Sequence, residues 1–162
     1  MDGSERLAPA VRRAPRESPT ILDAPWRRSV LRLGIVASVI AALTADLPWG
    51  DFQNHTHWGK VGWIPFVSPP VHLLDIAENL LLFAPLAFFV GLESSLERGT
   101  SWTHAAWRAA FIAFCVSFLG EWSQLYSHTR FPSATDLTCN VAGATCAAVI
   151  AVRGVGMWRV RV

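Results

Sequence analysis

The sequence predicts an all-α membrane protein, a four-transmembrane-helix bundle preceded by a disordered cytoplasmic N-terminal tail. Hydrophobic residues make up 52% of the 162 residues and charged residues only 16%, and the mean hydropathy is positive. Most apolar residues fall into four stretches, each close to the ~20 residues that cross a hydrocarbon layer ~30 Å thick. The eight Trp and nine Phe are typical of aromatic belts at two membrane boundaries. A net charge of +2 without a basic face argues against a nucleic-acid-binding protein.

Residues 1–25 form the predicted tail, and residues 26–162 form the predicted transmembrane domain. Arg, Pro, Ser and Ala dominate the tail, which carries too few apolar side chains to bury a core. Arg27 and Arg28, followed by an apolar run, also fit the pattern of a twin-arginine export signal. Three further apolar stretches and the lack of an evident soluble cargo favour a first membrane span instead.

The four apolar stretches cover about residues 30–47, 76–92, 105–126 and 137–152. Leu, Ile, Val, Ala and Phe occur on all faces of each stretch, as expected for helices that lie in lipid. Pro85, midway along the second stretch, predicts a kinked helix with a free carbonyl, because proline has no backbone N–H. Gly143 and Ala147 in the fourth stretch predict a face of small residues on which another helix packs closely.

Basic residues are distributed unequally between the loops. Of 14 Lys and Arg residues, only Lys60 and Arg130 lie in the first and third loops. By the positive-inside rule, both termini are expected in the cytoplasm of a bacterium and these two loops outside its cytoplasmic (inner) membrane. The tryptophans agree, because they fall into an inner and an outer group. The inner group is Trp26, Trp102, Trp107 and Trp158, and the outer group is Trp49, Trp58, Trp63 and Trp122.

Polar side chains gather where three of the predicted helices reach the outer boundary. On each helix they recur at i, i+3 or i+4 and therefore share one face. Because polar groups in spans usually face the bundle interior or a wet cavity, we expect them to line a water-accessible pocket that opens outward. Arg130, on the loop between the last two spans, is the natural partner for the carboxylates. The predicted ligand-binding residues are Asp75, Glu78, Asn79, Glu121, Gln124, Arg130, Asp136 and Asn140.

Part of this pattern also fits ordinary structural roles. Asp75 and Asp136 lie at helix N-termini, where carboxylates cap free amides and interact favourably with the helix dipole. Gln124 and Asn140 fit interhelical hydrogen bonds that only hold the helices together. Glu121 has no such explanation, because it lies about five turns into the third span, where no capping role exists.

Histidines are frequent in the predicted outer loops, which contain His55, His57, His72 and His128. His55 and His57, with His72 and Asp75, invite a zinc hypothesis. Loop histidines without a firm ligand spacing are more often solvated, however, and neither an HExxH pattern nor a Cys pair supports a site. The three cysteines favour no disulfide framework. The prediction is therefore no metal and no cofactor.

The motifs together resemble the VanZ-like family of small bacterial integral membrane proteins. The matching stretches are "WIPF" (63–66), "ENLLLFAPLAFF" (78–89) and the series Glu121-x-x-Gln124, Arg130, Asp136, Asn140 and Gly143, within residues 61–152. The chain departs from the family pattern at Ser133 and Thr135, where acidic residues are typical, and at Ala87, where glycine is usual. The resemblance implies an association, through the family's namesake, with resistance to teicoplanin, a glycopeptide that binds a cell-wall precursor outside the membrane. It implies no settled catalytic mechanism.

Three functions are compatible with this sequence. In the first, the pocket binds the head group of a membrane lipid, or of a lipid-linked glycan or cell-wall precursor, through Arg130 and the amides. In the second, the protein is an enzyme acting on such a lipid, with Glu121 or Asp136 as general acid or base. In the third, the polar residues only join helices or dock a partner. Substrate identity, protein partners and oligomeric state are not predicted.

Overall fold

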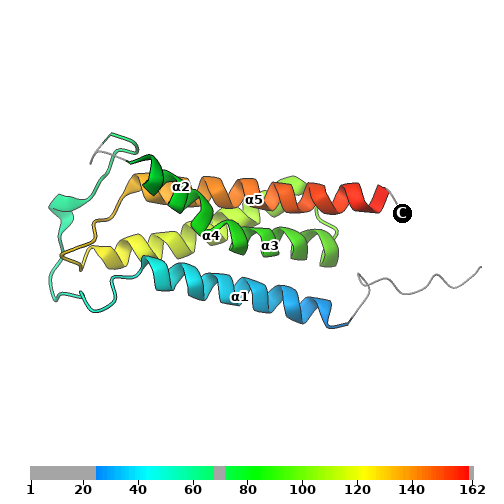
Figure 1. The fold of residues 1–162 in the computed structure, drawn as a ribbon, viewed down its shortest axis with the longest axis horizontal. Helices are drawn as coiled ribbons and strands as arrows, with labels where there is room; N and C mark the ends of the chain where they lie inside the picture. The colour runs from blue at the N-terminus through cyan, green and yellow to red at the C-terminus, as the bar shows by residue number, and fades with distance from the viewer. Residues whose placement is uncertain (1–24, 68–71, 161–162) are drawn as a thin grey trace, which may run out of the picture.

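A computed structural model describes residues 25–67 and 72–160 of the chain, with side chains described as far as residue 157 (Figure 1). The predicted tail lies outside the described residues except for residue 25, so its separation from residues 26–162 stays a prediction. The elements are α1 (Arg27–Asp46), a 3₁₀ turn η2 (Trp58–Lys60), α2 (Leu73–Leu82), α3 (Ala84–Glu97), α4 (Trp102–Gln124) and α5 (Ala134–Val160).

The helices form a bundle of four candidate membrane spans. The α2 and α3 helices follow one another directly and make one span of 25 residues, and the other spans have 20, 23 and 24 residues. The described part of the chain contains no strand. Consecutive spans run in opposite directions, so α1 and α4 end where α2 and α5 begin (Figure 1); we name this the loop end. The predicted fold class is confirmed: the chain is an all-α, multi-pass membrane protein whose spans require a lipid environment.

The second span is broken at Phe83, between α2 and α3. Pro85 lies in the first turn of α3 and has no N–H to donate to the Leu81 carbonyl, which accepts the N–H of Phe83 instead. The kink predicted at Pro85 is therefore confirmed. Because of the break, α2 packs against α5, whereas α3 packs against α1, α4 and α5. The direction of α2 thus leaves space between α1 and α2 at the loop end.

The core is built mostly from small residues. Phe83, Leu86 and Val90 supply its large side chains, and alanines from four helices fill the rest. Small residues allow backbones to approach closely. A Cβ on Gly143 would collide with the Leu80 carbonyl oxygen, so the close helix contact predicted on α5 is confirmed at Gly143, where α2 packs. Large apolar side chains instead cover the outer surface, where lipid would surround them.

Ion pairs hold together the end of the bundle opposite the loop end. Arg27 and Arg28, at the start of α1, both pair with Glu97 at the end of α3, with Arg27 Nη2 lying 2.6 Å from Glu97 Oε1. Arg108 Nη2 of α4 lies 2.6 Å from Glu93 Oε2 of α3. The twin arginines therefore have a structural role in the bundle, and the acidic residues at this end are neutralised by direct partners.

Asp51 joins the two loops at the loop end. Its Oδ2 accepts hydrogen bonds from Ser127 Oγ at 2.6 Å, from the His128 N–H at 3.0 Å, and from the Thr129 N–H and Oγ1 at 2.9 and 2.7 Å. The side-chain bonds from Ser127 and Thr129 hold the pKa of the Asp51 carboxyl well below its usual value. The loop between α1 and α2 is thus fixed against the turn between α4 and α5.

Substitution of Gly143 tests the close α2–α5 contact. Gly143→Ala should lower the stability of the protein by ~1–3 kcal/mol, because the added methyl group would separate α5 from the α2 backbone. The matched control is Gly154→Ala in the same helix, where a Cβ meets no atom within 4 Å and should be neutral or stabilising. Unfolding in detergent, followed by circular dichroism, measures both, and equal stability of the two variants would contradict the contact.

Labelling from outside the cell tests the orientation of the bundle. Lys60 and Asn54 are exposed at the loop end, and Gly99 and Gly156 are exposed towards the other end. In a background without the native cysteines, an impermeant maleimide should modify single cysteines at the first two positions and not at the last two. The reverse pattern would overturn the predicted cytoplasmic termini.

Candidate functional site

A polar cavity of ≈ 550 Å³ lies at the loop end of the bundle. It occupies the space that the broken second span leaves between α1 and α2, and the turn after α4 borders it. Its lining is mainly polar and charged. The lining residues are Ala45, Asp46, Asp75, Glu78, Asn79, Leu82, Gln124, Thr129, Arg130, Phe131 and Asp136.

Six of the eight predicted site residues line this cavity. Asp75, Glu78 and Asn79 lie in the first two turns of α2 at positions i, i+3 and i+4, which share one face of the helix. Gln124 is the last residue of α4, and Asp136 lies in the first turn of α5. They converge because α4 ends, and α2 and α5 begin, at the same end of the bundle. Arg130 completes the predicted set.

Asp46 is a lining residue that the sequence analysis missed. It is the last residue of α1 and only 7% exposed. Gln124 Nε2 donates to Asp46 Oδ1 at 3.0 Å and to its backbone carbonyl at 3.1 Å. Asp46 Oδ2 faces Gly120, where a Cβ would collide with it, and has no hydrogen-bond partner among the described residues. The available signal was that Asp46 is the one acidic residue in the predicted span 30–47.

Arg130 binds the end of α1 and forms no ion pair with the carboxylates predicted to be its partners. Its Nη1 donates to the carbonyls of Ala45 at 2.8 Å and of Asp46 at 3.3 Å. The last carbonyls of a helix have no intrahelical donor and carry the negative end of the helix dipole, so a guanidinium is favourable there. Within residues 25–67 and 72–157, ion pairs occur only at the opposite end of the bundle. The expected ion pair between Arg130 and one or more of Asp75, Glu78, Glu121 and Asp136 is therefore corrected.

Glu121 lies beside the polar cavity and lines a different, apolar hollow. Its side chain is buried, and Oε2 accepts the Ser133 N–H at 2.6 Å. Oε1 has no hydrogen-bond partner in the described part of the chain. The hollow measures ≈ 290 Å³, and its remaining lining is mostly aromatic and aliphatic. Those residues are Trp58, Val61, Trp63, Phe118, Trp122, Leu125, Pro132, Ser133, Ala134 and Leu137.

Asn140 is fully buried and lies outside the cavity lining. Its Nδ2 donates to Ser117 Oγ at 2.9 Å, which joins α5 to α4. This contact is an interhelical hydrogen bond, the structural role that the sequence suggested for Asn140. A ligand-binding role for Glu121 and Asn140 stays a prediction that the cavity geometry does not support directly.

Ser133 and Thr135, two of the three departures from the family pattern, have structural roles here. Ser133 Oγ accepts the N–H groups of Thr135 at 3.2 Å and Asp136 at 3.4 Å, so it caps the N-terminus of α5. Thr135 Oγ1 accepts the Phe66 N–H at 2.9 Å. Phe66 has a φ of 62°, a conformation that non-glycine residues rarely adopt, and this bond helps to hold it. Both hydroxyls therefore fix loop geometry beside the cavity.

The cavity carries an excess of negative groups. Four carboxylates line it, from Asp46, Asp75, Glu78 and Asp136, together with the guanidinium of Arg130. Carboxylates accept hydrogen bonds from hydroxyl and ammonium groups, and a guanidinium donates to phosphate or carboxylate. The lining can thus bind a ligand that is rich in donors and carries an anionic group.

These features define a multi-pass membrane protein with a polar cavity at one end of a four-span helical bundle. Residues 23–157 match the VanZ/LLP1 family, and the chain belongs to that family. The family resemblance predicted from the motifs is thereby confirmed. The chain has no match among curated proteins or among solved structures.

Proposed function

We propose that the polar cavity binds the head group of an envelope lipid, or of a lipid-linked glycan or cell-wall precursor, at the outer leaflet of the bacterial cytoplasmic membrane. The observation that carries the proposal is the ≈ 550 Å³ cavity lined by four carboxylates, two amides and one guanidinium. Its volume falls within the ~300–1,000 Å³ typical of ligand pockets. Charged residues within spans are costly and usually mark a functional site, which supports the same conclusion.

The lining determines which head groups fit best. The carboxylates accept hydrogen bonds from sugar hydroxyls or from an ammonium group, and Gln124 and Asn79 add amides. Arg130 uses Nη1 on the end of α1, which leaves its other donors for a phosphate or carboxylate of the ligand. Because carboxylates outnumber the guanidinium, a hydroxyl-rich or amine-bearing head group is favoured over a bare phosphate.

The apolar hollow beside Glu121 extends the proposal to the lipid chain. Leu125 and Leu137 line the hollow, and the residues directly before them, Gln124 and Asp136, line the cavity. Successive residues of a helix point about 100° apart, which places the hollow and the cavity on different sides of the α4–α5 contact. We assign the hollow, which Trp122 and other aromatic side chains line, to the hydrocarbon part of the ligand.

A catalytic role is the second candidate. Glu121 Oε1 and Asp46 Oδ2 are buried carboxylate oxygens without a hydrogen-bond partner among the described residues. Such an oxygen, in a partly dry site, is suited to accept or donate a proton during transfer or hydrolysis of the bound lipid. Glu121→Gln separates the two functions, because it keeps shape and hydrogen bonding but removes the acid or base. Retained lipid binding with loss of product formation would favour the enzyme.

Lipid retention tests the binding proposal. Asp75 and Glu78 are exposed in the cavity, so Asp75→Asn with Glu78→Gln should leave the fold intact. Each lost charged hydrogen bond should weaken binding by roughly 10- to 100-fold. Mass spectrometry of lipids that co-purify in mild detergent should therefore show a species in the wild type that the double variant loses. Arg98→Gln, exposed at the opposite end, is the control and should retain it. Equal retention by all three proteins would contradict the proposal.

A further inference from the structure

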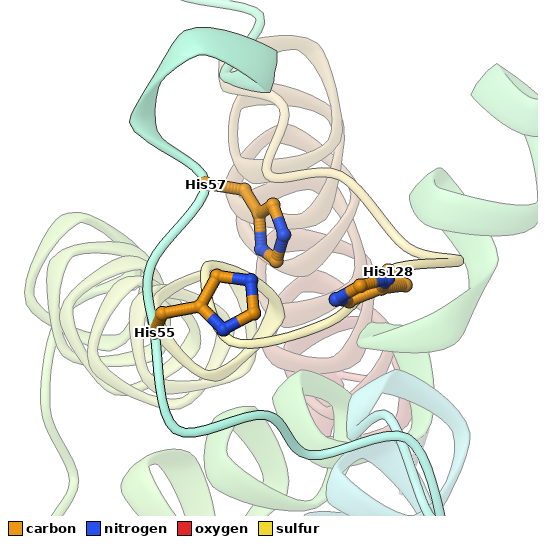
Figure 2. A group of neighbouring side chains, drawn as sticks. All are labelled: His55, His57 and His128. Atoms are coloured by element: carbon orange, nitrogen blue, oxygen red, sulfur yellow. The ribbon is translucent and has the colours of Figure 1, made fainter.

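Three histidines from two separate loops lie together outside the polar cavity. His55 and His57 belong to the loop after α1, and His128 belongs to the turn after α4. Figure 2 shows the three rings facing a common space between these loops. The ring centroids are 4.7 Å apart for His55 and His57, 4.7 Å for His57 and His128, and 5.4 Å for His55 and His128. One ring nitrogen of each histidine lies within 4.8 Å of those of the other two.

We propose that His55, His57 and His128 bind a divalent transition-metal ion, for which Zn²⁺ is the best match. Zn²⁺ takes imidazole nitrogens at ~2.0–2.1 Å in tetrahedral geometry, which places two ligand nitrogens about 3.3 Å apart. The three nitrogens need to approach one another by at most about 1.5 Å to reach that spacing, and small side-chain rotations supply this because His55 and His128 are exposed. The fourth position would remain open to water.

Backbone hydrogen bonds hold the two loops in the required register. The Gln53 N–H donates to the Tyr126 carbonyl at 2.7 Å, and the His57 N–H donates to the Leu125 carbonyl at 2.9 Å. The carboxylate of Asp51 fixes the main chain of His128 from the other side. These contacts position the ligands without any ion, so little conformational entropy would be lost on binding.

Hydrogen bonds to two of the rings leave the other ring nitrogen free for a metal. His57 Nδ1 lies 3.3 Å from the Leu125 carbonyl oxygen, which can only accept, so Nδ1–H is the donor. His55 Nδ1 lies 3.3 Å from Asn54 Oδ1, again an acceptor. Both rings therefore carry the lone pair on Nε2. Metal-binding histidines commonly donate their second N–H to a carbonyl or carboxylate in this way.

The prediction of no metal was based on the lack of a firm ligand spacing, and it did not consider His128 together with His55 and His57. His72 and Asp75 were the candidates to complete the site, but His72 is not part of the described cluster. His55 and His57 are alternate residues, which share a face in an extended segment, and their ring centroids lie 4.7 Å apart. The third ligand, His128, belongs to the turn between α4 and α5 and is distant from the other two in the sequence.

A bound ion would join the loop after α1 to the turn that carries Thr129 and Arg130. Both residues line the polar cavity, so the metal would fix one rim of that cavity. The metal site itself does not depend on the proposed lipid binding, because its ligands lie outside the cavity lining. Its place at the loop end gives it access to ions from the aqueous phase.

Metal binding by the tag-free full-length protein in detergent tests the proposal. After treatment with a chelator, the wild type should bind one Zn²⁺ per chain in a calorimetric titration, and elemental analysis should find the same ratio. Replacement of any one of His55, His57 and His128 by Gln should weaken binding at least about tenfold. The remaining two histidines provide matched controls, since His72→Gln and His104→Gln remove exposed histidines and should bind as the wild type does.

Cobalt supplies a measurement that needs no variant. Co²⁺ added to the wild type should give the intense visible absorption of a tetrahedral complex, and Zn²⁺ should abolish it by displacement. Failure of the wild type to bind Zn²⁺ at equimolar concentration would overturn the proposal. Unchanged binding by the triple His55→Gln, His57→Gln, His128→Gln variant would overturn it equally, and so would loss of binding in His72→Gln.

Discussion

The contact between the ends of α1 and α4 is the interaction on which the loop end depends. Asp46 fits against α4 because Gly120 has no side chain there, and Gln124 donates two hydrogen bonds to it. Arg130 binds the last carbonyls of α1 from the following turn. Asp46, Gln124 and Arg130 all line the polar cavity, so the same contact both joins the helices and forms one side of the candidate site. A polar group buried in a span is costly, and here hydrogen bonds offset part of that cost.

Acidic side chains have ion-pair partners at one end of the bundle and none at the other among the described residues. At the end opposite the loops, Glu93 and Glu97 have arginine partners within the protein. The cavity carboxylates have no ion-pair partner among the described residues, although Arg130 lies in the same lining. Functional sites commonly leave polar groups incompletely satisfied, because a ligand completes them. The break at Phe83 supports this arrangement, since it directs α2 away from α1 and opens the cavity between them.

Composition and local chemistry predicted much of the fold. Span number follows from the length of the apolar stretches, the break from the missing N–H of Pro85, and a close helix contact on α5 from Gly143. The details of the site depend on which helices are neighbours, and that was not readable from one sequence. Asp46 becomes a site residue only because α1 ends beside α4. Glu121 and Gln124, at i and i+3, point about 60° apart, which is enough to line different hollows. His128 joins His55 and His57 only through the pairing of two loops.

A crystal structure of the protein, grown from a lipid mesophase with its co-purified lipid, would show directly whether the polar cavity holds a lipid head group. We expect an open cavity between α1 and α2, with the polar head group of a ligand contacting Arg130 and the acidic residues of α2. We also expect Asp46 to lie against Gly120 and to accept hydrogen bonds from Gln124. A closed loop end, in which α2 packs directly on α1 and Arg130 pairs with Asp136 without space for a ligand, would contradict it.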